Sequence, residues 1–173
     1  TSVFKQPGIT VVQWGSSSKF AIKAQEAGCD AVVAEGFEAG GLNGREETTT
    51  MVLVPAVCSA VTIPVIAAGG IASGRQILSA MVLGAEGVQI GSRFVASDEA
   101  SSHVNFKTAV INAMEGDTML SLKQLSPVRL IKNKFYNEIQ AAEQHCATSS
   151  ELISLLGKGR AKKGVIEGDL DQG

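Results

Sequence analysis

Two turns, Gly69–Gly70 and Gly91–Ser92, contain the residues best suited to chemistry. Glycine has no Cβ, so the backbone of each turn can bend sharply and approach a ligand closely. The first turn precedes a predicted helix, whose free N-terminal amides and partial positive charge of roughly half a unit favour an anion. Ser92 adds a hydroxyl donor. We therefore predict a phosphate between Gly70 and Ser92. The alternative, that the glycines serve only tight turns, fits a single such turn better than two in succession.

The elements around these turns read as strand, helix and strand. The apolar run Ile63–Ala68 predicts a strand entered through Pro64, and Val88–Ile90 predicts the next one. Between them Ser73 and Gln76 fit a capping box at the start of a helix. Two strands of one sheet joined by a helix run parallel. Both turns are then expected at the carboxyl ends of neighbouring strands, where α/β folds bind ligands.

The preceding residues repeat this pattern. Ile9–Trp14 and Asp30–Ala34 are predicted strands, and Lys19–Ala27 is a predicted helix. A glycine-rich loop, Glu35–Arg45, then leads to a helix that opens at Thr48–Thr50. The result is four βα units with continuous apolar strands, which predict a parallel sheet in an α/β fold.

Beyond Val95 the pattern predicts helices only. One covers His103–Met114, a second starts at the cap Ser126-Pro127 and runs to about Gln144, and a third covers Ser150–Leu156. The expected division is residues 1–97 for the βα units with the ligand site, 98–157 for a helical segment and 158–173 for a polar tail. A closed (β/α)₈ barrel takes about 250 residues, so four units amount to half of one. We expect a fragment of a longer chain, or a partner that supplies the other half, because open sheet edges are avoided.

Composition narrows the class of protein. The chain has 173 residues, 45% of them hydrophobic, and a formal net charge of −2, which gives no indication of nucleic-acid or membrane binding. Three cysteines without a CxxC pattern predict reduced thiols and a cytoplasmic location. His103 and His145 lack metal-ligand spacing, so no metal is expected. Strand ends without lysine or paired carboxylates argue against a phosphate-binding barrel of the aldolase or isomerase class.

Three motifs, in order, carry a resemblance to a known family: Glu38-Ala39-Gly40-Gly41, Ala68-Gly69-Gly70-Ile71 and Gly87-Val88-Gln89-Ile90-Gly91-Ser92-Arg93-Phe94. Together they resemble the nitronate monooxygenase (2-nitropropane dioxygenase) family, to which the flavin-dependent enoyl-ACP reductases are related. The resemblance implies the C-terminal portion of an FMN-binding TIM barrel. It also implies an oxidoreductase that oxidises alkyl nitronates with O₂.

The resemblance also implies which positions meet FMN. Gly70 and Gln89 to Ser92 match positions at the phosphate and ribityl chain, Gly40 and its neighbours match a loop near the flavin ring, and Glu35 stands where many members have Gln. The implied cofactor-binding residues are Glu35, Ala39, Gly40, Gly41, Gly69, Gly70, Gln89, Ile90, Gly91 and Ser92. Leu42 occupies the family's active-site histidine position, so the catalytic residue stays unknown.

Two alternatives remain beside nitronate oxidation. One is an NAD(P)H-dependent FMN enoyl-ACP reductase, and the other is a flavin- or phosphate-binding homologue disabled by Leu42. The expected partners are a small nitronate or nitroalkane and O₂, with no nucleic acid and no membrane, and the resemblance leaves room for a homo-oligomer.

Overall fold

The computed structural model describes residues 8–173, which divide into two compact units. Unit 1 comprises Thr1–Ala39 and Asn43–Ile90, and unit 2 comprises Gly40–Leu42 and Gly91–Gly173. The longer part of unit 2 therefore begins directly after Ile90.

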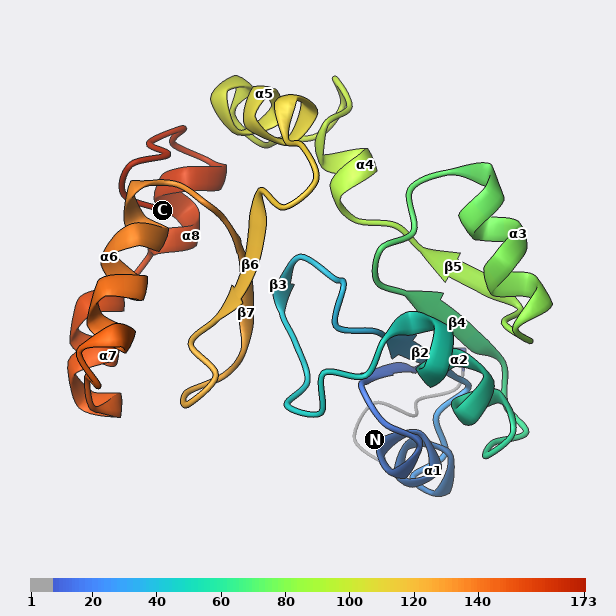
Figure 1. Cartoon of the computed structure of the whole chain (residues 1–173). Helices are drawn as coiled ribbons and strands as arrows, with labels where there is room; N and C mark the ends of the chain where they lie inside the picture. Colours follow the sequence, from blue (N-terminus) through green and yellow to red (C-terminus); the bar gives the residue numbers. More distant parts are fainter. Residues whose placement is uncertain (1–7) are drawn as a thin grey trace. The chain divides into compact units, whose positions relative to one another are not determined.

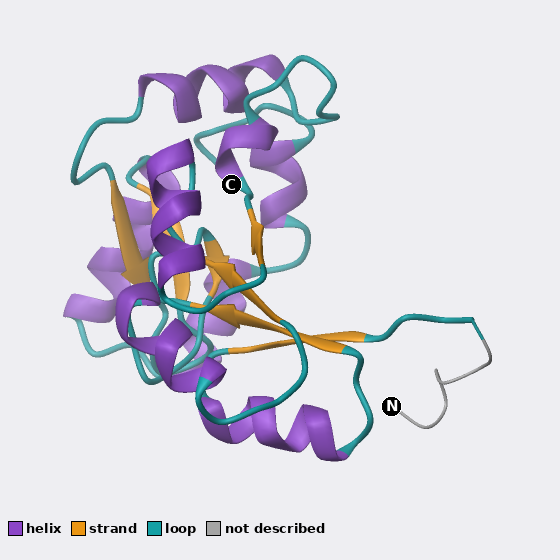
Figure 2. Ribbon diagram, turned by 90° about the vertical axis from the view of Figure 1, so that its right-hand side faces the viewer, coloured by secondary structure: helices purple, strands orange, loops and turns teal. Residues whose placement is uncertain are grey.

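Unit 1 is a parallel α/β unit, which confirms the fold class (Figure 1). Its four strands lie in the order β1-β2-β4-β5, and every neighbouring pair is parallel. The strands β1 and β2 pair in parallel, with Trp14 opposite Val33. Figure 2 shows the strands in orange and the helices in purple. The elements are β1 (Val12–Gly15), α1 (Ser18–Glu26), β2 (Ala31–Glu35), α2 (Thr50–Cys58), β4 (Val65–Ala68), α3 (Gly74–Val82) and β5 (Gly87–Gln89).

Side-chain caps set where the helices of unit 1 begin. The Ser17 hydroxyl accepts a hydrogen bond from Phe20 N at the start of α1, and Ser73 does the same for Gln76 N at the start of α3. The expected capping box at α3 is only half right, because the Gln76 side chain accepts from Ala72 N instead of Ser73 N. The second contact ties the helix to the turn that precedes it.

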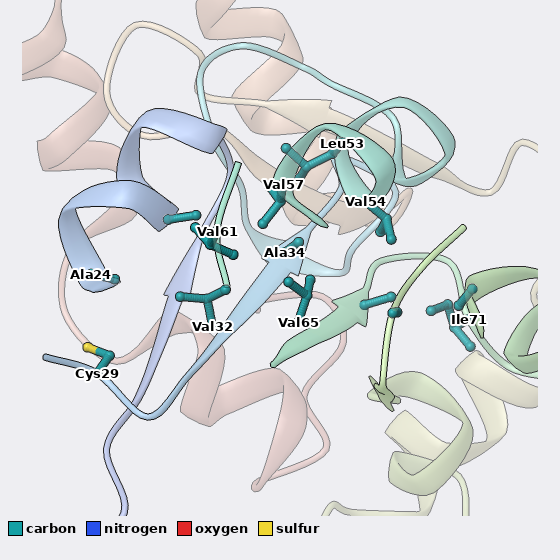
Figure 3. Close-up of a cluster of buried hydrophobic side chains, with 14 residues drawn as sticks. Ala24, Cys29, Val32, Ala34, Leu53, Val54, Val57, Val61, Val65 and Ile71 are labelled. Atoms are coloured by element: carbon teal, nitrogen blue, oxygen red, sulfur yellow. The ribbon is translucent and has the colours of Figure 1, made fainter. Parts of the chain in front are cut away.

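The core of unit 1 lies between the sheet and α2. Figure 3 shows Val54 and Val57 of α2 in one cluster with Val32, Ala34 and Val65 of the central strands β2 and β4. All five side chains are buried. Burial of each valine contributes about 1.5–3 kcal/mol relative to exposure, so this cluster fixes the strand ends that carry the candidate site.

Unit 2 contains strands that the sequence did not predict. β6 and β7 pair antiparallel, and β3 adds to β7 in the order β3-β7-β6. The expectation of helices only beyond Val95 is therefore wrong. The elements are β3 (Gly41–Leu42), α4 (Ser92–Val95), α5 (Val104–Asn112), β6 (Thr118–Ser121), β7 (Val128–Ile131), α6 (Lys134–Gln144), α7 (Ser149–Leu156) and α8 (Arg160–Val165).

The misplaced helix start at Ser126-Pro127 has a physical reason. Proline suits the first turn of a helix, but it also suits the entry to a strand. Here β7 follows at once, and α6 begins only at Lys134, where the Asn133 side chain accepts from Tyr136 N at 2.8 Å. The polar tail expected at residues 158–173 contains a short helix, α8.

The core of unit 2 is smaller than that of unit 1. Four side chains, Leu122, Phe135, Ile139 and Leu152, form its buried cluster. An apolar cavity of about 290 Å³ adjoins them, with Leu42 of β3 in its lining. Packing is therefore less complete in unit 2 than in unit 1.

Two further expectations concern cysteines and membranes. Cys29, Cys58 and Cys146 are free thiols, as expected, but only Cys29 is buried, so Cys146 is not a core residue. Among residues 8–173, no helix combines the length and apolar character needed to cross a membrane.

Candidate functional site

The Gly69–Gly70 turn directly follows β4 and is closely packed. Its backbone φ angles are +99° and +68°, in the left-handed region that favours glycine. A Cβ on Gly69 would lie 2.7 Å from the carbonyl oxygen of Gly36 and 2.8 Å from Thr50 Oγ1. The Gly36 oxygen belongs to the backbone and cannot rotate away. Glycine is therefore required at position 69 by both conformation and space.

Glu38 and Thr50 hold this turn from the loop after β2. Thr50 N lies 3.1 and 3.0 Å from the two carboxylate oxygens of Glu38, and Thr50 Oγ1 lies 3.0 Å from Oε2. Thr50 is the first residue of α2, so the carboxylate also sits at the positive end of that helix. Glu38 therefore braces its loop by accepting a hydrogen bond from a backbone amide.

Two backbone amides of the turn remain available for a ligand. Gln76 Nε2 donates to the Gly70 carbonyl at 2.7 Å, and Gln76 Oε1 accepts from Ala72 N at 2.9 Å. Within residues 8–173, neither Gly70 N–H nor Ile71 N–H donates to another protein group. Gly70 is exposed, so solvent or a ligand can reach its amide.

The end of β5 lies beside the end of β4. Ala68 is paired with Gln89, so the two strands finish at the same edge of the sheet. This confirms that the glycine turns follow neighbouring parallel strands. Gln89 is exposed, whereas the Ile90 side chain packs against the core of unit 1. Only the backbone of Ile90 is then suited to contact a cofactor.

The remaining glycines of the predicted site belong to unit 2. A Cβ on Gly40 would lie 3.8 Å from Ser92 Oγ, so these two predicted residues are neighbours. Within residues 8–173, the exposed Ser92 hydroxyl makes no hydrogen bond to protein. Gly41 and Leu42 form β3, and Leu42 is 63% exposed. Gly91 has open space around its Cα.

Glu35 and Trp14 form a polar pair at the ends of β2 and β1. Burial raises the pKa of the Glu35 carboxyl, and a hydrogen bond from the Trp14 side chain opposes that rise more weakly. Trp14 is 40% exposed, so its side chain is not part of the buried core.

Ala39 has a backbone role in the same loop. Its N–H donates to the Gly36 carbonyl at 3.1 Å, and its carbonyl accepts from the buried Asn43 amide at 2.9 Å. These bonds fix the loop just before Gly40, which agrees with a structural role for Asn43 and not with proton transfer.

The side chains of the two histidines form hydrogen bonds at helix ends. His103 Nδ1 accepts from Asn105 N at the start of α5, and His145 Nδ1 lies 2.7 Å from the Ala141 carbonyl oxygen at the end of α6. The described part of the chain contains no cluster of three or more His, Cys, Asp or Glu side chains that could hold a metal.

Sequence reasoning missed Gly36, the hydroxyl role of Thr50 and the link from Gln76 to Gly70. The run Thr48-Thr49-Thr50 signals a helix start, but local sequence does not say which hydroxyl turns toward a distant strand. Gln76 was identified from its cap spacing, although its longest-range contact is with the turn.

The chemistry of these groups suits a phosphate ester. Within unit 1, two adjacent amides after β4 supply donors, and the glycine at position 70 lets a ligand approach the backbone closely. Leucine at position 42 cannot exchange a proton. The donor set therefore fits the phosphate of a cofactor such as FMN and supplies no general base at Leu42.

Comparison with known proteins agrees with this description. A probable nitronate monooxygenase of Staphylococcus saprophyticus is 36% identical over 173 aligned positions, which cover 92% of this chain and 49% of that protein. One of Staphylococcus aureus (strain JH9) is 38% identical over 176 positions, covering 94% and 49%. The chain thus spans about half the length of these relatives.

Solved structures show the same relationship. FabK from Thermotoga maritima is 41% identical with a TM-score of 0.91, and the match covers 99% of this chain and 54% of that one. Nitroalkane oxidase from Streptomyces ansochromogenes is 30% identical with a TM-score of 0.75, covering 95% and 50%. A family model described as nitronate monooxygenase matches residues 3–173. The chain therefore belongs to the nitronate monooxygenase family.

Proposed function

We propose that this chain is part of an FMN-dependent oxidoreductase that oxidises alkyl nitronates with O₂. The observation that carries the proposal is the pair of unengaged amides at Gly70 and Ile71, on the turn that the family resemblance assigns to the FMN phosphate. The names of the relatives, probable nitronate monooxygenase and nitroalkane oxidase, support the reaction class.

The proposed roles follow from the groups present. The Gly70 and Ile71 amides and the Ser92 hydroxyl would bind the phosphate, and the backbone of Gln89 to Gly91 would follow the ribityl chain. Gly40 and Gly41 would leave space at the ring. When bound, FMN supplies the electron-transfer chemistry, while the protein binds the phosphate and keeps the site dry.

Leu42 decides which substrate form we propose. A neutral nitroalkane must lose its α-proton before oxidation, and general-base catalysis typically accelerates such a step by about 10²–10⁴. A nitronate is already an anion and needs no such step. We therefore propose nitronates as substrates, together with O₂, and place the protein in the cytoplasm, which suits its free cysteines.

A comparison of substrates tests the role of position 42. The FMN-loaded protein is expected to oxidise an alkyl nitronate far faster than the matching nitroalkane. Leu42→His is expected to raise the rate on the nitroalkane by about 10²-fold, with little change on the nitronate. Equal rates on both substrates before the substitution would contradict this account of Leu42.

A second candidate is an NAD(P)H-dependent FMN enoyl-ACP reductase. It is favoured by FabK, which is more similar to this chain than the nitroalkane oxidase is, at 41% against 30% identity. Anaerobic mixing separates the candidates, because a nitronate should bleach the flavin in the first case and NADH in the second. A flavin bleached by neither compound would favour a disabled homologue.

A further inference from the structure

We infer that Thr50 and Gln76 are positioning residues that aim the Gly70 and Ile71 amides at the phosphate. The inference rests on the proposed function, because it concerns how the proposed phosphate site is built. All the residues involved belong to unit 1. In the sequence, Thr50 indicates only the start of a helix, and Gln76 indicates only a helix cap.

The Thr50 hydroxyl has one hydrogen and three acceptors within reach. They are Glu38 Oε2 at 3.0 Å, the Ala68 carbonyl at 3.2 Å and the Gly69 carbonyl at 2.9 Å. Ala68 O already accepts from Gly36 N at 2.9 Å, and Glu38 already accepts from Thr50 N. The Gly69 carbonyl has the shortest distance and no other donor among the described residues, so it is the acceptor that depends on Thr50.

Because the peptide bond is planar, the contact between Thr50 and the Gly69 carbonyl also sets the direction of the Gly70 N–H. The carbonyl of Gly69 and the N–H of Gly70 belong to one peptide unit, which is trans and planar, so they point in opposite directions. Holding the Gly69 oxygen against Thr50 therefore turns the Gly70 N–H away from α2. The Gly70 amide belongs to an exposed residue and has no protein acceptor within residues 8–173.

Gln76 acts in the same way one peptide later. Its Nε2 donates to the Gly70 carbonyl at 2.7 Å, which turns the Ile71 N–H away from Gln76. Its Oε1 accepts from Ala72 N, so the side chain is fixed at both ends. Two successive amides are thus oriented by two side chains, without either side chain needing to touch the ligand.

The neighbouring charge is placed so that it does not oppose an anion. A Cβ on Gly70 would lie 3.1 Å from Glu38 Cβ, so Glu38 is the acidic residue beside the turn. Its carboxylate is bound to the first amide of α2 through both oxygens. The charge is therefore engaged at Thr50 and not presented to the Gly70 amide.

FMN affinity in matched variants of the 173-residue chain tests the inference. Thr50→Val removes the hydroxyl with little change in shape, Thr50→Ser retains it, and Gln76→Glu removes the donor to Gly70 while keeping an oxygen for Ala72. Thr49→Val is the control, because Thr49 makes no side-chain capping bond. Flavin fluorescence quenching gives the affinity, and thermal unfolding shows that each variant folds.

We expect Thr50→Val and Gln76→Glu each to bind FMN roughly 10-fold more weakly, since a charge-assisted hydrogen bond loses its alignment. Thr50→Ser and Thr49→Val should stay within about 3-fold of the parent, a difference well under 1 kcal/mol. As a second readout, inorganic phosphate should shift the NMR signals of the Gly70 and Ile71 amides in the parent and less in Thr50→Val.

The outcomes separate the inference from the proposed function. If the parent binds FMN and Thr50→Val binds it equally well, the positioning role is wrong while the phosphate site stands. If FMN and phosphate leave the Gly70 and Ile71 amides of the parent unchanged, the phosphate site itself is wrong, and the inference falls with it. Loss in Thr50→Val that Thr50→Ser does not rescue would also overturn the role of the hydroxyl.

Discussion

The two glycine turns resemble each other in sequence but differ in what the fold demands of them. Gly69 has a φ of +99°, and its space is limited by a backbone carbonyl and by Thr50. Gly91 has a φ of −99°, which any residue adopts, and a Cβ there would meet nothing within 4 Å. The first glycine is required by the structure around it, whereas nothing in the described structure requires the second.

This difference shows at which position the presence of glycine indicates a bound ligand. At position 69 glycine is explained by packing alone, so its presence says little about a ligand. At position 91 φ lies outside the left-handed region and a Cβ would meet nothing within 4 Å, so neither positive φ nor close packing accounts for glycine there. Close approach of a ligand is a further physical reason for glycine at a turn. Gly91, which the structure constrains less than Gly69, is therefore the better indicator of a ligand.

The largest expected effect is on stability at the first turn. Gly69→Ala should lower the free energy of unfolding by about 2–5 kcal/mol, because a left-handed alanine costs about 1–2 kcal/mol and overpacking a further 1–3. Gly91→Ala should change it by less than about 0.5 kcal/mol. Urea unfolding followed by the fluorescence of Trp14, the single tryptophan, measures both. Equal losses of stability in Gly69→Ala and Gly91→Ala would contradict the proposed difference between the two turns.

The next largest expected effect is on FMN binding, for which the second turn matters more than the first. Gly91→Ala should weaken FMN binding about tenfold, or about 1.4 kcal/mol, while leaving stability unchanged, because the new methyl group occupies space needed by the cofactor. Ala96→Gly, a change of the same size at the end of α4, is the control for local disturbance. Unaltered FMN affinity in Gly91→Ala would mean that the second turn does not approach the cofactor.

A smaller loss is expected when the brace of the first turn is removed. Glu38→Ala leaves the first amide of α2 without its carboxylate acceptor and should cost about 1 kcal/mol of stability. Glu26→Ala, at an exposed position on α1, should change stability by less than about 0.5 kcal/mol. Urea midpoints of the two variants give the comparison, and a similar shift in both would contradict the bracing role.

The smallest effect concerns pH. Because burial raises the pKa of Glu35 in the folded protein, its contribution to stability is present below the ordinary value of 4.5 and is lost as the pH rises through the raised value. Glu35→Gln stays neutral and should flatten the decline in stability between pH 4.5 and neutrality. Urea unfolding of both proteins across this range measures the difference, and parallel curves would exclude a raised pKa.

The sequence predicted unit 1 far better than unit 2. In β2 the residues Ala31–Ala34 are continuously apolar and follow a helix capped by Ser17, so local pattern and tertiary structure agree. The pair Ser126-Pro127, directly before β7, satisfies the rules for a helix start and for a strand entry. The choice is made by the pairing of β7 with β6, which lies earlier in the chain. Local reasoning does not contain that information.

The same limit applies to the candidate site. The glycine turns were identified because glycine and strand ends are visible in the sequence. Thr50 was missed as a site residue because its hydroxyl meets Gly69, 19 residues away, only after β2 and β4 have paired. Residues that aim backbone groups leave no local signature.

The central claim is that the turns bind a phosphate, and a comparison of FMN with riboflavin tests it most directly. The two flavins share the ring and the ribityl chain and differ only in the phosphate. Titration of the 173-residue chain, followed by flavin fluorescence, is expected to show at least about 100-fold tighter binding of FMN, since each charge-assisted hydrogen bond contributes about 1.5–3 kcal/mol. Equal affinities for FMN and riboflavin would contradict the account.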